Sequence, residues 1–103
     1  GDLGGLGIAH RAYKAAVAAR GGDEADEVDG VGGDQRFFQA WAGVWAVLTR
    51  PETMITRVTT DPHSPGEFRA NQVPRNMDAF HAAYGTQEGD GMWLEPGERV
   101  TIW

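Results

Sequence analysis

The sequence predicts a mainly α-helical fold with long loops and one short strand at its C-terminal end. Apolar residues recur every three or four positions in four separate segments, which is the spacing of one helix face. Stretches rich in glycine, proline and acidic residues separate these segments and are typical of turns and loops. Residues 99–103 alternate polar and apolar side chains, as a half-buried strand does.

The first helix is predicted over residues 6–20. Leu6, Ala9 and Tyr13 fall on one face, alanine favours helix, and a Gly-Gly pair follows. Residues 21–34 form a predicted loop with six acidic side chains. Their spacing does not match that of an EF-hand calcium loop, so we interpret this segment as a solvated acidic connector.

The second helix is predicted over residues 35–49, with Asp34 as its N-cap. Its apolar face carries large aromatic side chains, which need a large partner surface. The members of this aromatic face are Phe37, Trp41, Val44, Trp45 and Leu48, with Phe38 beside them. Core packing is the simplest interpretation for most of these residues.

Proline suits the first turn of a helix, so a third helix is predicted over residues 51–58. Residues 59–71 are predicted to be a loop. A fourth helix is predicted between a cap at Asn76 and a stop at Gly85. A turn-rich loop, 86–98, then leads to the terminal strand.

Charge and composition argue against several function classes. The net charge is −6, from 15 acidic and 9 basic residues, whereas a nucleic-acid partner requires a basic face. No apolar run approaches the roughly 20 residues of a membrane span, and no signal-like start is present. The chain has no cysteine, which excludes disulfides and cysteine metal sites and fits a reducing compartment.

The segment TTDPHSPGEFRAN, residues 59–71, is the strongest candidate for a functional site. Its two prolines restrict the backbone around His63. His63 and Arg69 can both donate to a substrate carbonyl and to the oxyanion that forms from it. Asp61 is close enough in sequence to orient or charge His63. The alternative interpretation is that Arg69 pairs with a surface acid and His63 fills a turn.

The histidines are weak candidates for a metal site, since Asp61 and His63 could ligate as a loop pair but have no obvious third ligand. No two of them have helical i,i+4 spacing, and the sequence contains no HExxH. His81 is predicted to be a packed or surface residue. Ser64 cannot form a catalytic pair with His63, because adjacent side chains in an extended segment point apart.

Four motifs occur in an order that is also found in a known family. DPHSPGEFRAN resembles a D-x-H-S-P-x-x-F-R segment, and GDLGGLGIAHRAY resembles the end of E-x-x-x-D-x-G-G-L. FFQAWAGVWAVLTRPE resembles an aromatic helix that ends in R-P-E, and NMDAFHAAYG with VTIW resembles the family's tail. The whole chain therefore resembles neprilysin-type zinc metallopeptidases, which include endothelin-converting enzyme and bacterial oligoendopeptidases. The resemblance implies the helical C-terminal portion of a thermolysin-like catalytic domain, with residues 1–103 as a single partial domain.

The resemblance implies roles for five residues. Asp2 matches an aspartate that orients a zinc-ligand histidine. His63 matches the histidine that stabilises the tetrahedral intermediate, and Arg69 matches the arginine that binds a substrate backbone carbonyl on the primed side. Val44 and Trp45 match positions that line the apolar pocket for the side chain after the scissile bond.

The resemblance also implies zinc as the cofactor of a longer parent protein. Its ligands would be two histidines of HExxH and a glutamate four residues before the position of Asp2, all before Gly1, with no metal ligand within this chain. The 103 residues alone are therefore expected neither to bind zinc tightly nor to hydrolyse peptides. The expected partners are a peptide substrate and the remainder of the parent domain, and self-association of the isolated chain is expected through the apolar face of residues 41–48.

Two function classes stay open at this point. One is the C-terminal part of a zinc endopeptidase, and the other is a non-catalytic helical module that binds a peptide or protein partner through its aromatic face. Extracellular family members often carry a cysteine near the C-terminus. Its absence here favours a bacterial, cytoplasmic type, while a secreted or membrane-anchored parent stays open. Pro62 stands where other residues are common and should stiffen the loop.

Overall fold

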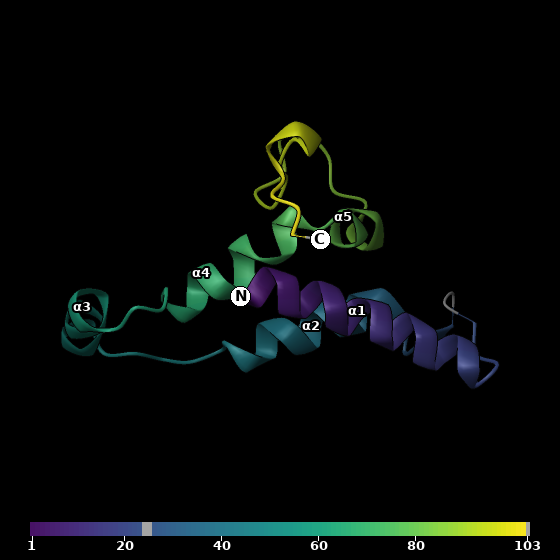
Figure 1. The fold of residues 1–103 in the computed structure, drawn as a ribbon, viewed down its shortest axis with the longest axis horizontal. Helices are drawn as coiled ribbons and strands as arrows, with labels where there is room; N and C mark the ends of the chain where they lie inside the picture. Colours follow the sequence, from purple (N-terminus) through teal and green to yellow (C-terminus); the bar gives the residue numbers. More distant parts are fainter. Residues whose placement is uncertain (24–25, 103) are drawn as a thin grey trace.

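The structure is a computed structural model that describes residues 1–23 and 26–102. The described chain is mainly helical, as predicted. Its elements are α1 (Asp2–Ala19), β1 (Glu27–Val28), β2 (Val31–Gly32), α2 (Gly33–Val44), α3 (Pro51–Thr60), α4 (Gly66–Gln72), the 3₁₀ turn η1 (Pro74–Asn76), α5 (Asp78–Tyr84) and the 3₁₀ turn η2 (Pro96–Glu98). Figure 1 shows α3 standing apart from the other helices at the end of two extended connections. Within the described ranges, no helix is both long and apolar enough to cross a membrane.

The core is small and lies where α1, α2 and α5 meet. Leu6, Phe38 and Phe80 are its buried members, one from each helix. The rings of Phe38 and Phe80 meet edge to face, with their centroids 5.4 Å apart. Phe37 and Trp41 pack against this cluster, so the core-packing interpretation of these two aromatic residues is confirmed.

Asp34 does not cap α2, contrary to the prediction. The N-cap is Gly32, whose backbone N–H donates to Oε1 of Gln35 at 3.3 Å. Asp34 lies in the first turn and accepts hydrogen bonds from Lys14 Nζ at 3.1 Å and His10 Nε2 at 3.1 Å. Burial opposes ionisation of Asp34, but these hydrogen bonds outweigh it and lower its pKa. The carboxylate therefore ties α1 to α2.

The predicted acidic loop contains a β-hairpin that the sequence interpretation missed. Strands β1 and β2 are antiparallel, with Glu27 opposite Gly32 and Val28 opposite Val31. Asp29 and Gly30 form the two-residue turn with positive φ angles of 53° and 76°. Asp-Gly is a strong signal for such a turn, so the hairpin could have been predicted. Positions 24 and 25 of this segment lie outside the described residues.

Helices α1 and α2 have other boundaries than predicted. Helix α1 begins at Asp2 rather than at residue 6. Helix α2 ends at Val44 rather than at residue 49, with Trp45 as its C-cap, and Arg50 takes the extended conformation that is favoured before a proline. Leu48 therefore lies outside the helix and is fully exposed, so the predicted aromatic face is not continuous.

The predicted loop at 59–71 is wrong over most of its length. Helix α3 continues to Thr60, and α4 occupies Gly66–Gln72, so only the 61–65 connection is non-helical. Pro65 has φ −53° and ψ 151°, which is compatible with a helix that starts immediately after it. The prolines restrict the residues before them and leave the residues that follow free to form a helix.

The C-terminal part also departs from the prediction. Helix α5 begins after Met77, while Asn76 lies in η1 and accepts a hydrogen bond from the Val100 backbone N–H at 2.8 Å. Gly85 ends α5 with φ 60°, as predicted. Residues 99–102 form no strand, because none of the strands in the described ranges lies beside them to offer a backbone ladder. The last residue of the predicted strand, Trp103, lies outside the described residues.

His81 is packed in the interior, one of its two predicted placements, and is 6% exposed. Its Nδ1 contacts the Thr86 hydroxyl, and its Nε2 lies 2.8 Å from the Arg75 carbonyl oxygen. His81→Phe keeps an aromatic ring but leaves both partners unsatisfied. We expect the free energy of unfolding of the whole protein to fall by about 1–3 kcal/mol, measured by chemical denaturation. Tyr84→Phe is the control, because it removes an exposed hydrogen bond to Gln35 and should cost less.

Candidate functional site

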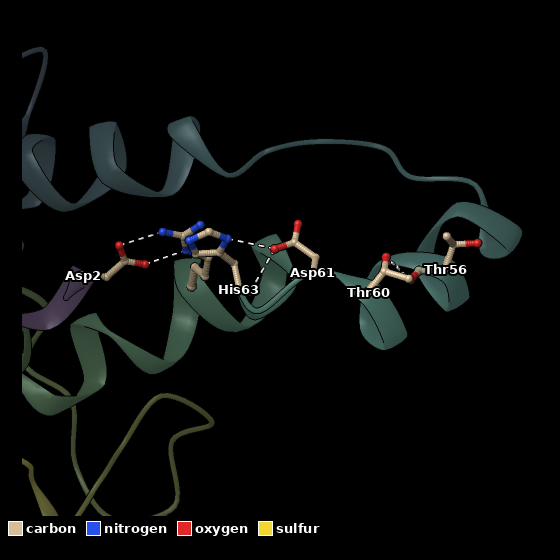
Figure 2. A network of polar contacts seen from close by, with 6 residues as sticks. Asp2, Thr56, Thr60, Asp61 and His63 are labelled. Atoms are coloured by element: carbon tan, nitrogen blue, oxygen red, sulfur yellow. Dashed lines mark hydrogen bonds and ion pairs between the residues drawn. The ribbon is translucent and has the colours of Figure 1, made fainter.

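Three of the predicted site residues line one cleft of about 560 Å³. Asp2 comes from the first turn of α1, His63 from the 61–65 connection, and Arg69 from α4. The remaining lining residues are Gly1, Leu3, Pro62, Ser64, Phe68, Gln72 and Val73. Figure 2 shows Asp2 on one side of this site and His63 with Asp61 on the other.

Arg69 and Asp2, which are 67 positions apart, form a bidentate ion pair. Arg69 Nε donates to Oδ2 of Asp2 at 2.6 Å, and Nη2 donates to Oδ1 at 2.8 Å. The hydrogen bond from Arg69 lowers the pKa of Asp2 from its ordinary value of 3.8, against the smaller effect of burial. The pair therefore contributes stability above pH 3.8, and this contribution is lost as the pH falls through the lowered pKa.

The guanidinium of Arg69 is also held on its face. Its Cζ lies 3.8 Å from the centroid of the Trp45 ring, which is a cation–π contact. The Trp45 ring in turn meets the Trp41 ring edge to face, with centroids 5.5 Å apart. The indole Nε1 of Trp41 donates to the backbone carbonyl of Arg69 at 3.1 Å. Contacts with three residues thus fix one arginine beside the cleft.

His63 is oriented by Asp61. The Asp61 Oδ1 lies 2.8 Å from His63 Nδ1 and accepts the His63 backbone N–H at 2.9 Å. The backbone N–H is the main cause of the lowered pKa of Asp61, followed by the imidazole contact. The His63 side chain is 66% exposed, and no described residue bonds to its Nε2. Nε2 is therefore available to a ligand in the cleft.

Val44 and Trp45 line a second hollow of about 460 Å³, which shares His63, Ser64 and Arg69 with the first. Its other apolar walls come from the 46–50 connection and from α3: Val47, Leu48, Met54 and Val58. All of the sequence-predicted site residues therefore lie in or beside two adjoining hollows.

Sequence reasoning assigned Trp41 to the core and missed its contact with the site. The signal for this contact was present, because Trp41 lies four residues before Trp45 and so shares its helix face. The contribution of α3 to the second hollow was also missed, since it depends on where the two extended connections place that helix. Within residues 1–23 and 26–102, no group of three or more histidine, cysteine or acidic side chains is placed to hold a metal ion.

Comparison with known proteins identifies a family whose members are similar to this chain over almost its whole length. The model of a family described as "Peptidase family M13" matches residues 1–100. The chain is 36% identical over 104 residues to neprilysin-1 of Caenorhabditis elegans, and the match covers 99% of the chain and 14% of that protein. It is 31% identical over 102 residues to human neprilysin, with coverage of 99% and 13%.

A solved structure is similar over the same range. The zinc metalloprotease Zmp1 of Mycobacterium tuberculosis, determined in complex with an inhibitor, superposes with a TM-score of 0.90 at 46% identity. The match covers 99% of this chain and 15% of that chain. This chain therefore spans about one seventh of the length of the proteins that it resembles.

Proposed function

The chain belongs to peptidase family M13, and from this premise we propose that it is the C-terminal part of a zinc metalloendopeptidase. Residues 1–103 would form a single partial domain that completes a catalytic site begun by the preceding sequence. The observation that carries the proposal is the common cleft of Asp2, His63 and Arg69, which come from three separate elements. Peptide bonds would be the substrate, and the remainder of the catalytic domain would be the partner.

The residues of this cleft fit a zinc centre supplied by the preceding sequence. A ligand four positions before Asp2 would lie one turn earlier on a continued α1 and on the same helix face. Both oxygens of Asp2 accept from Arg69, yet each retains a second lone pair that can accept from the N–H of a metal-bound imidazole. Bound zinc would polarise the scissile carbonyl and lower the pKa of the attacking water.

The residues of this chain would hold the substrate and stabilise the developing charge. His63, held by Asp61 at Nδ1, would donate from Nε2 to the oxyanion of the tetrahedral intermediate. Arg69 would donate from its guanidinium to a substrate backbone carbonyl after the scissile bond. Val44 and Trp45 would line the pocket for an apolar side chain at the first primed position.

Metal removal tests this function in the whole protein. We expect it to cleave unstructured peptides, to lose activity in a zinc chelator, and to regain it when zinc is restored. A non-catalytic binding module would instead bind peptides with an affinity unaffected by the chelator and leave them intact. That second function is disfavoured because Phe38 of the aromatic face belongs to the core, and Phe37 and Trp41 pack against it. Chelator-insensitive activity would contradict the zinc mechanism.

The exposed apolar side chains of this chain also fit a partial domain. Leu48, Ile55 and Val58 are each more than 60% exposed. The remainder of the parent domain would cover part of this surface, and the isolated chain would associate with itself through it. Light scattering of the isolated chain at increasing concentration measures this self-association.

A further inference from the structure

We propose that Trp41 is a positioning residue for Arg69, through the hydrogen bond from its indole N–H to the Arg69 backbone carbonyl. The inference rests on the proposed carbonyl-binding role of Arg69 and adds a residue to it. Trp41 does not line the 560 Å³ cleft, so it would act through Arg69 rather than on the substrate.

The hydrogen bond falls in the last turn of a short helix, α4. Helix α4 has seven residues, and Arg69 is in its last turn. The Arg69 carbonyl is the fourth from the end of Gly66–Gln72, so its regular helical partner would be the N–H of the C-cap residue Val73, and the indole of Trp41 supplies a donor from another helix. So short a helix has little stability of its own. The indole of Trp41 therefore fixes a backbone segment that the helix alone would leave poorly held.

Trp41 is itself firmly placed. It packs against the core cluster of Leu6, Phe38 and Phe80, and its ring meets that of Trp45 one helical turn later. Trp45 touches the face of the Arg69 guanidinium, while its own Nε1 is buried without a hydrogen-bond partner among the described residues. The last turn of α2 and its C-cap residue thus contact both ends of the arginine, its backbone through Trp41 and its side chain through Trp45.

This arrangement has a specific consequence for ligand binding. Asp2 and Trp45 hold the guanidinium, and Trp41 holds the backbone from which the side chain extends, so the position of the remaining N–H donors in the cleft depends on both ends of the residue. Loss of the Trp41 hydrogen bond should therefore weaken the contact between Arg69 and a ligand carbonyl. Contacts made elsewhere in the cleft should be unchanged.

The test uses Trp41→Phe in the zinc-loaded whole protein, which keeps an aromatic ring and removes the donor. Two hydroxamate peptide inhibitors are compared. They are identical except that one presents an amide carbonyl to Arg69 and the other carries an uncharged alkene in its place. Trp93→Phe is the matched control, because it also removes an indole N–H, here one bonded to Glu95 at 3.1 Å and outside the cleft.

We expect Trp41→Phe to raise the Kd of the amide inhibitor about threefold to tenfold, with the Kd of the alkene inhibitor unchanged. In an Arg69→Met background the same substitution should have no further effect on either inhibitor. Trp93→Phe should change neither Kd. Equal weakening of both inhibitors by Trp41→Phe would show a merely structural role and overturn the inference, as would no change in either.

Failure of the proposed function would look different. A wild-type protein without chelator-sensitive cleavage would refute the peptidase. A wild-type peptidase that binds the amide and alkene inhibitors equally would overturn carbonyl binding by Arg69 and, with it, the role of Trp41.

Discussion

His63→Ala is expected to lower kcat of the whole protein by about 10²–10³, with a much smaller change in KM. The proposed donor from His63 Nε2 acts on charge that is present in the tetrahedral intermediate and not in the bound substrate. Its loss therefore raises the activation barrier more than it weakens binding. Steady-state kinetics on a peptide substrate, with zinc content measured for each variant, provides the test.

Thr60→Ala is the control for this substitution. Thr60 lies three residues before His63 (Figure 2), and its hydroxyl donates to the Thr56 carbonyl within α3, at 2.8 Å. The Thr60→Ala protein should retain the wild-type kcat. A His63→Ala variant with unchanged kcat and full zinc content would show that the oxyanion role has been assigned to the wrong residue.

Arg69→Met is expected to lower kcat/KM by about 10–150-fold, mainly through KM. The range corresponds to loss of a hydrogen bond from a charged donor, about 1.5–3 kcal/mol. Methionine keeps an unbranched apolar stem against Trp45 but offers no donor to the substrate carbonyl or to Asp2. Arg69→Lys should be intermediate at best, because lysine keeps the charge but cannot reproduce the bidentate geometry.

A pH measurement separates this effect from unfolding. In the wild type, the Asp2–Arg69 pair contributes stability that is lost as the pH falls below 3.8. Without Arg69, the lowered pKa of Asp2 should return toward its ordinary value. The Arg69→Met protein should therefore lose less stability than the wild type as the pH falls below 3.8. Thermal unfolding of both proteins across the acid range measures it. An unchanged KM in a folded Arg69→Met protein would contradict carbonyl binding.

The sequence predicted which residues belong to the site, but it did not predict the contacts that hold those residues in place. The segment around His63 and Arg69 stood out because its prolines, histidine and arginine lie within thirteen residues. The family's motifs then added Asp2 from the other end of the chain. The bidentate pair between Asp2 and Arg69 was not predicted, because contacts between residues 67 positions apart leave no local pattern.

The helices with a clear apolar period, α1, α2, α3 and α5, were each predicted, with errors mainly at their ends. Helix α4 was missed because its seven residues are too few to show an apolar period, and the two prolines before it indicated a loop. The terminal strand was predicted wrongly because the alternation of polar and apolar side chains indicates only which faces a strand would have. A strand also needs a partner strand, and residues 99–102 have none in the part of the chain that the structure describes.

The sequence by itself determined the helical class, the turn at Gly85, and the presence of an imidazole and a guanidinium donor near one rigid connection. These features follow from φ restrictions and side-chain periods, which act between near neighbours in the chain. Only the tertiary structure decided that α1 brings Asp2 to Arg69 and that α2 brings Trp41 and Trp45 to the same arginine. Those contacts depend on how the Leu6, Phe38 and Phe80 core sets three helices together, and packing between distant segments is not encoded in any one of them.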